Sequence, residues 1–154
     1  QKNIDANIVI DAGALFFMKD FGCPTNAIIT PHPGEAAMLL DCSVKDIQKN
    51  RLEAAKELFR QYNCLVILKG YETIVFDGEA FKCTDGGPAL SSAGTGDVLA
   101  GLVGSFLAQG LERRDAARFS VAIHGAAGDR FSQNKKIRGL TATKLIRIIT
   151  QEMM

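Results

Sequence analysis

The chain has 154 residues, of which 47% are hydrophobic and 23% are charged, and its formal net charge is +1. These values fit a globular protein with a sizeable core, and we expect residues 1–154 to form a single domain. The nearly neutral charge and the absence of Trp argue against nucleic-acid binding. No apolar run approaches the roughly 20 residues that a membrane span requires, so no membrane partner is expected.

The four cysteines are far apart in the sequence and form no Cys-x-x-Cys pair. This spacing supports neither a zinc site nor a redox motif, and no metal ligands are predicted from it. We interpret the cysteines as reduced thiols of a cytoplasmic protein. They are Cys23, Cys42, Cys64 and Cys83.

Three short apolar runs, 8–11, 27–30 and 65–68, are typical of strands buried on both faces. The first ends in Asp11, the second ends in Thr30, and Lys69 follows the third. Helical patterns between them predict crossover connections and an α/β fold with a mostly parallel sheet. Ligands of such sheets bind beyond the carboxyl ends of the strands, where Asp11 is either functional or a turn aspartate.

The segments between and after these runs predict further elements. Residues 35–40 favour a short helix, and Ser43 with Asp46 forms a capping box that opens a longer helix through Phe59. Asp77-Gly78, between two strand-like runs, predicts a two-residue hairpin and hence an antiparallel edge of the sheet. A final amphipathic helix is expected from Thr141, with Leu145, Ile146 and Ile149 on its apolar face.

A helix with a face of small residues is expected after Asp115, which we predict to be its cap. This face, which we expect to suit close packing, consists of Ala116, Phe119, Ala122, Ile123, Ala126 and Ala127. His124 lies in the same helix. We favour a packed or capping role for His124 over a catalytic one.

Apolar residues at helical spacing predict a helix from about Gly96 toward Gln109. The first amides, from Gly94 to Asp97, would be free to bind an anion, because a helix N-terminus favours negative charge. Asp97 is itself negative. It either caps the helix or accepts a hydroxyl proton while the amides hold a phosphate.

His32 lies between Pro31 and Pro33, next to Gly34 and Glu35. The prolines stiffen the loop, so the imidazole is presented in a fixed direction at the end of a strand. We favour contact with a ligand over a purely structural role for His32.

Five motifs occur in the following order along the chain: Asp11-Ala-Gly-Ala-Leu15, Thr30-Pro-His-Pro-Gly-Glu35, Lys69-Gly-Tyr-Glu-Thr73, Gly87-Pro-Ala-Leu-Ser-Ser-Ala-Gly-Thr-Gly-Asp-Val-Leu-Ala-Gly101 and His124-Gly-Ala-Ala-Gly-Asp129. Together they resemble the ADP- or ATP-dependent NAD(P)H-hydrate dehydratases, a branch of the ribokinase-like fold. The resemblance runs from about Asn7 to Thr150. It implies a three-layer ribokinase-like fold that lacks the N-terminal part of the family domain.

The activity that the resemblance implies is the repair of hydrated NADH or NADPH (NAD(P)HX). ADP or ATP, with Mg²⁺, phosphorylates the ring hydroxyl, and loss of phosphate restores NAD(P)H. By the matching motifs, Asp97 is the base and contacts the hydrated dinucleotide, and His32 binds the same substrate. Contacts to the adenine nucleotide fall on Lys69, Gly70, Tyr71, Glu72, Thr73 and Gly96, and the transferring phosphoryl group is stabilised by Gly94, Thr95 and Gly96.

This chain departs from the family pattern at two places, with Gly13 where an aspartate is usual and Ser91-Ser92 where Ala-Thr is usual. It also lacks the segment that precedes the Asp11 strand in the family. We therefore expect a fragment, a cleaved product or one chain of a split enzyme, which forms homo-oligomers or associates with the missing segment. The alternatives are a ribokinase-like kinase for a small alcohol and a truncated, non-catalytic nucleotide-binding protein.

Overall fold

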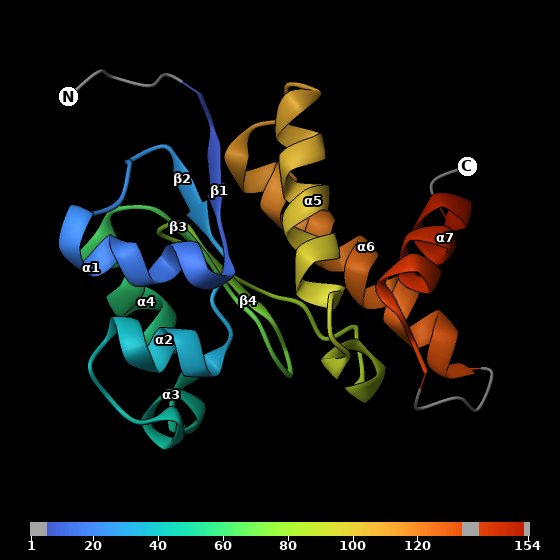
Figure 1. Ribbon diagram of the computed structural model, residues 1–154, viewed down its shortest axis with the longest axis horizontal. Helices are drawn as coiled ribbons and strands as arrows, with labels where there is room; N and C mark the ends of the chain where they lie inside the picture. The colour runs from blue at the N-terminus through green and yellow to red at the C-terminus, as the bar shows by residue number, and fades with distance from the viewer. Residues whose placement is uncertain (1–5, 134–138, 153–154) are drawn as a thin grey trace.

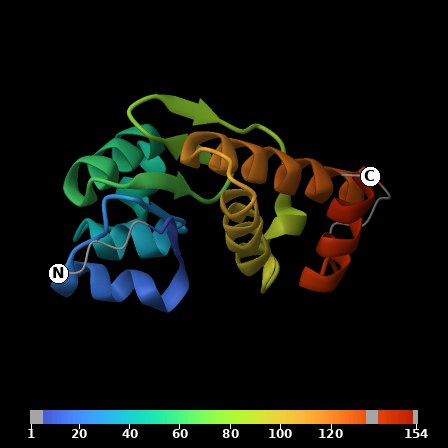
Figure 2. The same ribbon diagram turned by 90° about the horizontal axis from the view of Figure 1, so that it is seen from above.

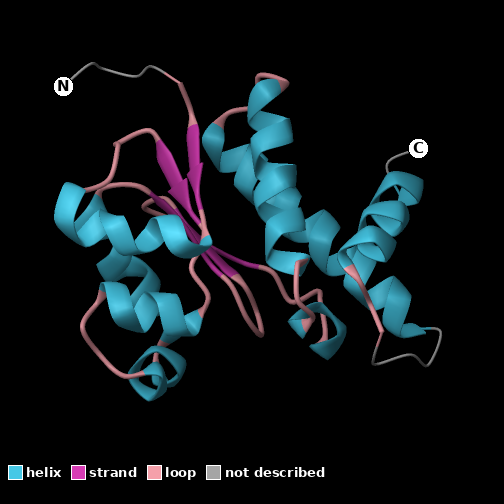
Figure 3. Cartoon of the chain, in the orientation of Figure 1, coloured by secondary structure: helices cyan, strands magenta, loops and turns pink. Residues whose placement is uncertain are grey.

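The computed structural model describes residues 6–133 and 139–152. Within these residues the sheet has five strands in the order β1-β2-β3-β4-β5 (Figures 1 and 3). Strands β1, β2 and β3 are parallel to one another, whereas β4 and β5 continue the sheet in antiparallel orientation. The predicted parallel sheet with an antiparallel edge is confirmed. The strands are β1 (Ile8–Ile10), β2 (Ala27–Ile29), β3 (Leu65–Leu68), β4 (Ile74–Phe76) and β5 (Ala80–Lys82).

Helices cover both faces of the sheet. The first face packs against η1 (Ala12–Phe17), α1 (Met18–Phe21), α2 (Pro33–Leu39), α3 (Val44–Lys49) and α4 (Arg51–Tyr62). The second face packs against α5 (Thr95–Ala108) and α6 (Arg113–Gln133). The remaining elements are η2 (Pro88–Ser91) and α7 (Ala142–Glu152).

Alternation of side chains along the strands explains these three layers. Ile29 and Val66 point into the first cluster, whereas their neighbours Ile28 and Ile67 point into the second. Because both faces are covered, β2 and β3 are apolar and buried at every position. A third cluster joins α6, η2 and α7, and Figure 2 shows α7 at the end of the molecule away from the sheet.

Two predicted helix boundaries are wrong. The helix that opens at Ser43 does not run through Phe59, because Asn50 leaves helical geometry and its side chain accepts a hydrogen bond from the amide of Glu53. Asparagine competes with helix propagation in this way, and it divides the segment into α3 and α4. Helix α6 begins at Arg113, so that Asp115 lies within its first turn and is not its cap.

The hairpin is confirmed, but its loop is one residue longer than predicted. Phe76 pairs with Ala80, so the loop contains Asp77, Gly78 and Glu79. Arg114 of α6 donates to Asp77 and Glu79, which ties the loop to the helix layer.

At the other side of the sheet, the outer edge of β1 has no partner strand among the described residues. No helix in the described part of the chain has the length and apolar character needed to cross a membrane.

Candidate active site

Polar side chains at the ends of the parallel strands meet at one edge of the sheet. Lys69 follows β3, and its Nζ donates to Oδ1 of Asp11 after β1 at 2.8 Å. The hydroxyl of Thr30, after β2, donates to the same oxygen at 2.6 Å. The side chains of Lys69 and Asp11 are only 17% and 13% exposed, so this ion pair is shielded from bulk solvent. These three side chains thus meet beyond the carboxyl ends of the strands, the region where ligands of parallel sheets bind.

His32 connects to this pair through Glu35. Its backbone N–H donates to Oε2 of Glu35 at 2.7 Å, and the same carboxylate oxygen lies 3.9 Å from Nζ of Lys69. The Nδ1 atom of His32 accepts hydrogen bonds from the amides of Gly34 and Glu35, so the imidazole caps α2. The Nε2 atom of His32 lies 3.4 Å from Oε1 of Glu35, and the side chain as a whole is 56% exposed, so the imidazole caps the helix and still presents surface to solvent.

Lys69 also lies against the first turn of α5. A Cβ atom on Gly96 would be 3.2 Å from Nζ of Lys69. The absence of a side chain at Gly96 thus allows the ammonium group to approach the backbone at the N-terminus of this helix. A positive side chain and a helix N-terminus together form an arrangement that favours an anion.

The amides of this turn differ in their availability. The N–H of Thr95 donates to Ser92 O at 3.3 Å, and the N–H of Val98 donates to Gly94 O at 3.2 Å. The amides of Gly96 and Asp97 donate to no group in the described residues. Gly96 and Asp97 therefore offer free donors to an anion. The amide of Thr95 already has a partner, and the part predicted for Thr95 in the anion site stays a prediction.

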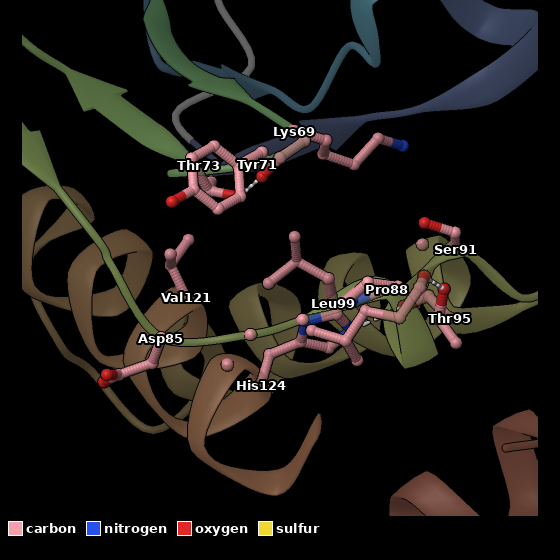
Figure 4. Close-up of a pocket in the computed structure, with 16 residues that line it drawn as sticks. Lys69, Tyr71, Thr73, Asp85, Pro88, Ser91, Thr95, Leu99, Val121 and His124 are labelled. Carbon is pink, nitrogen blue, oxygen red and sulfur yellow. Dashed lines mark hydrogen bonds between the residues drawn. The ribbon is translucent and has the colours of Figure 1, made fainter. Parts of the chain in front are cut away.

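A cavity of about 280 Å³ opens beside Lys69 and the first turn of α5 (Figure 4). In the close-up, Lys69, Tyr71 and Thr73 lie on one side, and Thr95, Leu99 and His124 lie on the other. The predicted residues that line the cavity are Lys69, Gly70, Tyr71, Thr73, Thr95 and Gly96. The structure thus places most of the predicted nucleotide-binding residues around one cavity.

The segment 85–91 forms another wall of this cavity. Gly87 to Ser91 belong to the fourth sequence motif, but the sequence assigned them no contact with a ligand. It lies directly on α6 because two glycines there leave room. A Cβ on Gly125 would be 2.8 Å from Asp85 O, and a Cβ on Gly128 would be 2.6 Å from Leu90. The small-residue face of α6 was the signal that another segment packs closely there.

Glu72 and Gly94 do not line this cavity. Glu72 pairs with Lys82 on β5 at 2.5 Å and has a positive φ of 53°. Behind this loop, the guanidinium of Arg51 donates to the carbonyls of Leu68 and Lys69. The loop after β3 is therefore fixed from both sides.

Asp97 lies outside the cavity that contains Lys69. It is exposed in the first turn of α5 and lines a groove of about 470 Å³ between α5 and α7. The other walls of this groove are mainly apolar, with Val98, Leu102 and Ile146 among them. The first turn of α5 thus separates the cavity on one side from the Asp97 carboxylate on the other.

His124 reaches the same turn from α6. It is buried, and its Nε2 lies 2.8 Å from Thr95 O. Burial lowers the pKa of His124 most, the charge of Lys69 lowers it further, and the bond to Thr95 O only partly opposes this shift. The preferred packed role of His124 is confirmed, although the sequence did not indicate that it also lines the cavity.

Within the described residues, no group of three or more His, Cys, Asp or Glu side chains is placed to hold a metal ion. Carboxylates such as Asp11 are already engaged by Lys69 and Thr30. The described chain therefore provides no protein cage for a metal.

Comparison with known proteins identifies the family. The sequence profile of the NAD(P)H-hydrate dehydratases matches residues 1–151. The chain belongs to this family. It is 41% identical over 140 residues to a bifunctional NAD(P)H-hydrate repair enzyme of Vibrio cholerae, with 90% of this chain and 28% of the relative covered. It is 37% identical over 155 residues to the ADP-dependent (S)-NAD(P)H-hydrate dehydratase of Neisseria meningitidis, with 94% of this chain and 52% of the relative covered.

Solved structures of the dehydratase family confirm the ribokinase-like fold. The ADP/ATP-dependent NAD(P)H-hydrate dehydratase of Bacillus subtilis, co-crystallised with ATP/Mg²⁺ and soaked with CoA, superposes with a TM-score of 0.88 at 32% identity. The match covers 96% of this chain and 55% of that chain. The chain thus spans about half the length of single-function dehydratases and less of the bifunctional repair enzymes.

Proposed function

We propose that this chain acts in the ADP- or ATP-dependent dehydration of NAD(P)HX to NAD(P)H, a repair reaction for nicotinamide nucleotides. The observation that carries the proposal is the position of Lys69 Nζ, 3.2 Å from the Cβ position of Gly96, beside the free amides of Gly96 and Asp97. A nucleotide in the adjacent cavity would direct its terminal phosphate to these donors. Membership of the dehydratase family supplies the chemistry for this anion site.

Both compartments adjoin the first turn of α5, and in this proposal the transfer is direct, between ligands that meet at the N-terminus of the helix. The terminal phosphoryl group would be held by Lys69 and Gly96, while the hydroxyl of the hydrated dinucleotide would approach from the side of Asp97. Asp97 would accept the hydroxyl proton as the bond from oxygen to phosphorus forms and the bond to the leaving nucleotide breaks. Cleavage of the bond from the ring carbon to the phosphate oxygen, with loss of a proton from the neighbouring ring carbon, would then form the ring double bond and restore the reduced nicotinamide.

In this proposal His32 binds the hydrated dinucleotide through the exposed part of its imidazole, and Lys69 through Thr73 bind the nucleotide. We propose that Mg²⁺, when bound, is carried by the nucleotide phosphates and water, as is common for this ion, and offsets their charge. The absence of a protein cage among the described residues is compatible with an ion held in this way.

We also propose that the free edge of β1 is covered in solution, by a second copy of this chain or by another segment of the same protein. An unpaired strand edge is a template for association, and the exposed Phe16, Phe17 and Phe21 add apolar surface nearby. Sedimentation of residues 1–154 alone tests this, because a stable monomer at high concentration would show that the edge needs no cover.

The decisive experiment incubates the protein with hydrated NADH and either ADP, ATP or no nucleotide. We expect NADH absorbance to rise only with nucleotide, and to fall to background in a Lys69→Ala variant. Phosphoryl transfer to a different small alcohol would instead favour a kinase of related fold. Nucleotide binding with no turnover would favour a non-catalytic protein. Lys56→Ala is the matched control, because Lys56 is an exposed lysine on α4 that pairs with Glu53, away from the cavity.

A further inference from the structure

The imidazole of His124 is hydrogen-bonded to the peptide unit between Thr95 and Gly96, whose N–H belongs to the proposed anion site. Its Nε2 lies 2.8 Å from Thr95 O, and a carbonyl oxygen only accepts hydrogen bonds. Nε2 must therefore carry the hydrogen and donate it. Thr95 itself is buried, and its hydroxyl donates to Leu90 O and Ser92 O.

The carbonyl of Thr95 and the N–H of Gly96 belong to one peptide unit, which is planar and trans. The two groups point in opposite directions, so a bond that fixes the carbonyl also fixes the direction of the N–H. This peptide lies at the first residues of α5, where glycine at position 96 permits more backbone orientations than other residues do, so a hydrogen bond to its carbonyl restricts it further. His124 thus acts on the Gly96 amide from the opposite side of the peptide.

We propose that His124 is a positioning residue for phosphate binding, whose Nε2–H holds the Thr95–Gly96 peptide so that the Gly96 amide faces the nucleotide phosphate beside Lys69. This inference rests on the proposed function, since it assumes that the phosphate binds at this turn. It assigns no proton transfer to His124. A neutral imidazole is sufficient, because donation by Nε2 does not require a charge.

Two substitutions separate this role from simple packing. In His124→Gln, the side-chain amide nitrogen reaches about as far as Nε2 and retains a donor toward Thr95 O. In His124→Asn, the amide reaches only about as far as Nδ1, so polarity is kept but the bond is lost. Ser120→Ala is the matched control, because Ser120 is fully buried one turn earlier in α6 and its hydroxyl has no partner in the described residues.

The experiment measures ADP and ATP affinity by calorimetry, and the melting temperature, in the complete protein. We expect His124→Asn to lose about tenfold in affinity, as for one lost hydrogen bond, while His124→Gln and Ser120→Ala bind like the wild type. Equal affinity of the Asn and Gln variants, with both folded, would overturn the inference. If the Asn variant does not fold, His124→Leu removes the donor without burying an unpaired amide and takes its place.

A second readout distinguishes failure of this inference from failure of the proposed function. The amide resonance of Gly96 is followed by NMR during titration with ADP. A wild-type protein whose Gly96 resonance does not respond to ADP would contradict the proposed nucleotide site itself. A response of the same size in wild type and His124→Asn would contradict only the positioning role.

Discussion

The ammonium of Lys69 lies 2.8 Å from Oδ1 of Asp11, although 58 positions separate the two residues in the chain. This pair holds the lysine side chain across the ends of the parallel strands, with its nitrogen beside Gly96. Asp11 thereby restricts where the positive charge can be, and the helix N-terminus provides the neighbouring amides.

Removal of the lysine charge should weaken nucleotide binding. We expect Lys69→Ala to lower ADP and ATP affinity by at least about tenfold, because a charge-assisted hydrogen bond to phosphate contributes roughly 1.5–3 kcal/mol. The variant also leaves Asp11 and Glu35 without the cation beside them. Calorimetric titration measures the loss, and unchanged affinity would exclude a phosphate contact for Lys69.

A methyl group at position 96 should displace the lysine without harming the fold. The Cβ of Gly96→Ala would meet the flexible end of Lys69 at 3.2 Å, so we expect weaker nucleotide binding. Helix stability should rise by up to about 1 kcal/mol, since alanine is the better helix former. Gly104→Ala is the control, because no heavy atom lies within 4 Å of its Cβ position. Equal nucleotide affinity of the two variants would refute a role for the close approach.

Loss of the base should abolish turnover and spare binding. Asp97→Asn keeps the size of the side chain and removes its ability to accept a proton, so we expect turnover of hydrated NADH to fall about 10²- to 10⁴-fold. Nucleotide affinity should stay within a few-fold, because Asp97 lies outside the cavity. If the variant retains most of the turnover, Asp97 is not the base, and its charge only stabilises the first turn of the helix.

His32 requires variants that separate capping from ligand binding. His32→Ala removes the cap of α2, so we expect a loss of roughly 0.5–2 kcal/mol in unfolding free energy as well as weaker binding of the hydrated dinucleotide. His32→Asn retains an oxygen that can cap the helix but removes Nε2. We expect it to keep the melting temperature and still bind the dinucleotide weakly. If His32→Asn binds as the wild type does, the histidine has only a capping role.

Burial of His124 predicts a loss of stability in acid. Its pKa is lowered in the folded protein, so below about pH 6.5 the unfolded chain takes up a proton that the folded protein does not. Stability is then fully present above that pH and declines as the pH falls toward the folded-state pKa, by up to about 1.36 kcal/mol per pH unit. Unfolding curves of His124→Gln should lack this component, whereas those of His32→Asn should keep it.

Local patterns predicted much of this structure. The three apolar strands, the hairpin at Asp77-Gly78 and the helix that follows Gly94 are each encoded by contiguous residues. The Lys69–Asp11 pair is not, because only the sheet brings those residues together. The rule that ligands bind at the carboxyl ends of parallel strands pointed to this edge but not to the pairing.

The errors arose where two local signals competed. Asn50 can continue a helix or cap the next one, and its side chain forms the cap with Glu53. The part predicted for Thr95 in the anion site stays a prediction, although Ser92 O accepts its amide. The cavity wall at 85–91 could not be predicted, because it depends on how closely the chain approaches Gly125 and Gly128 across α6.

The first turn of α5 stands between the nucleotide cavity and the groove that contains Asp97. Under the proposed function, the two ligands would enter from opposite sides and neither would need to leave before the other arrives. The phosphoryl group would pass directly from the nucleotide to the hydroxyl of the second ligand, and no side chain of the protein would be phosphorylated. Such an arrangement implies sequential rather than ping-pong kinetics, with no phosphorylated form of the protein along the way.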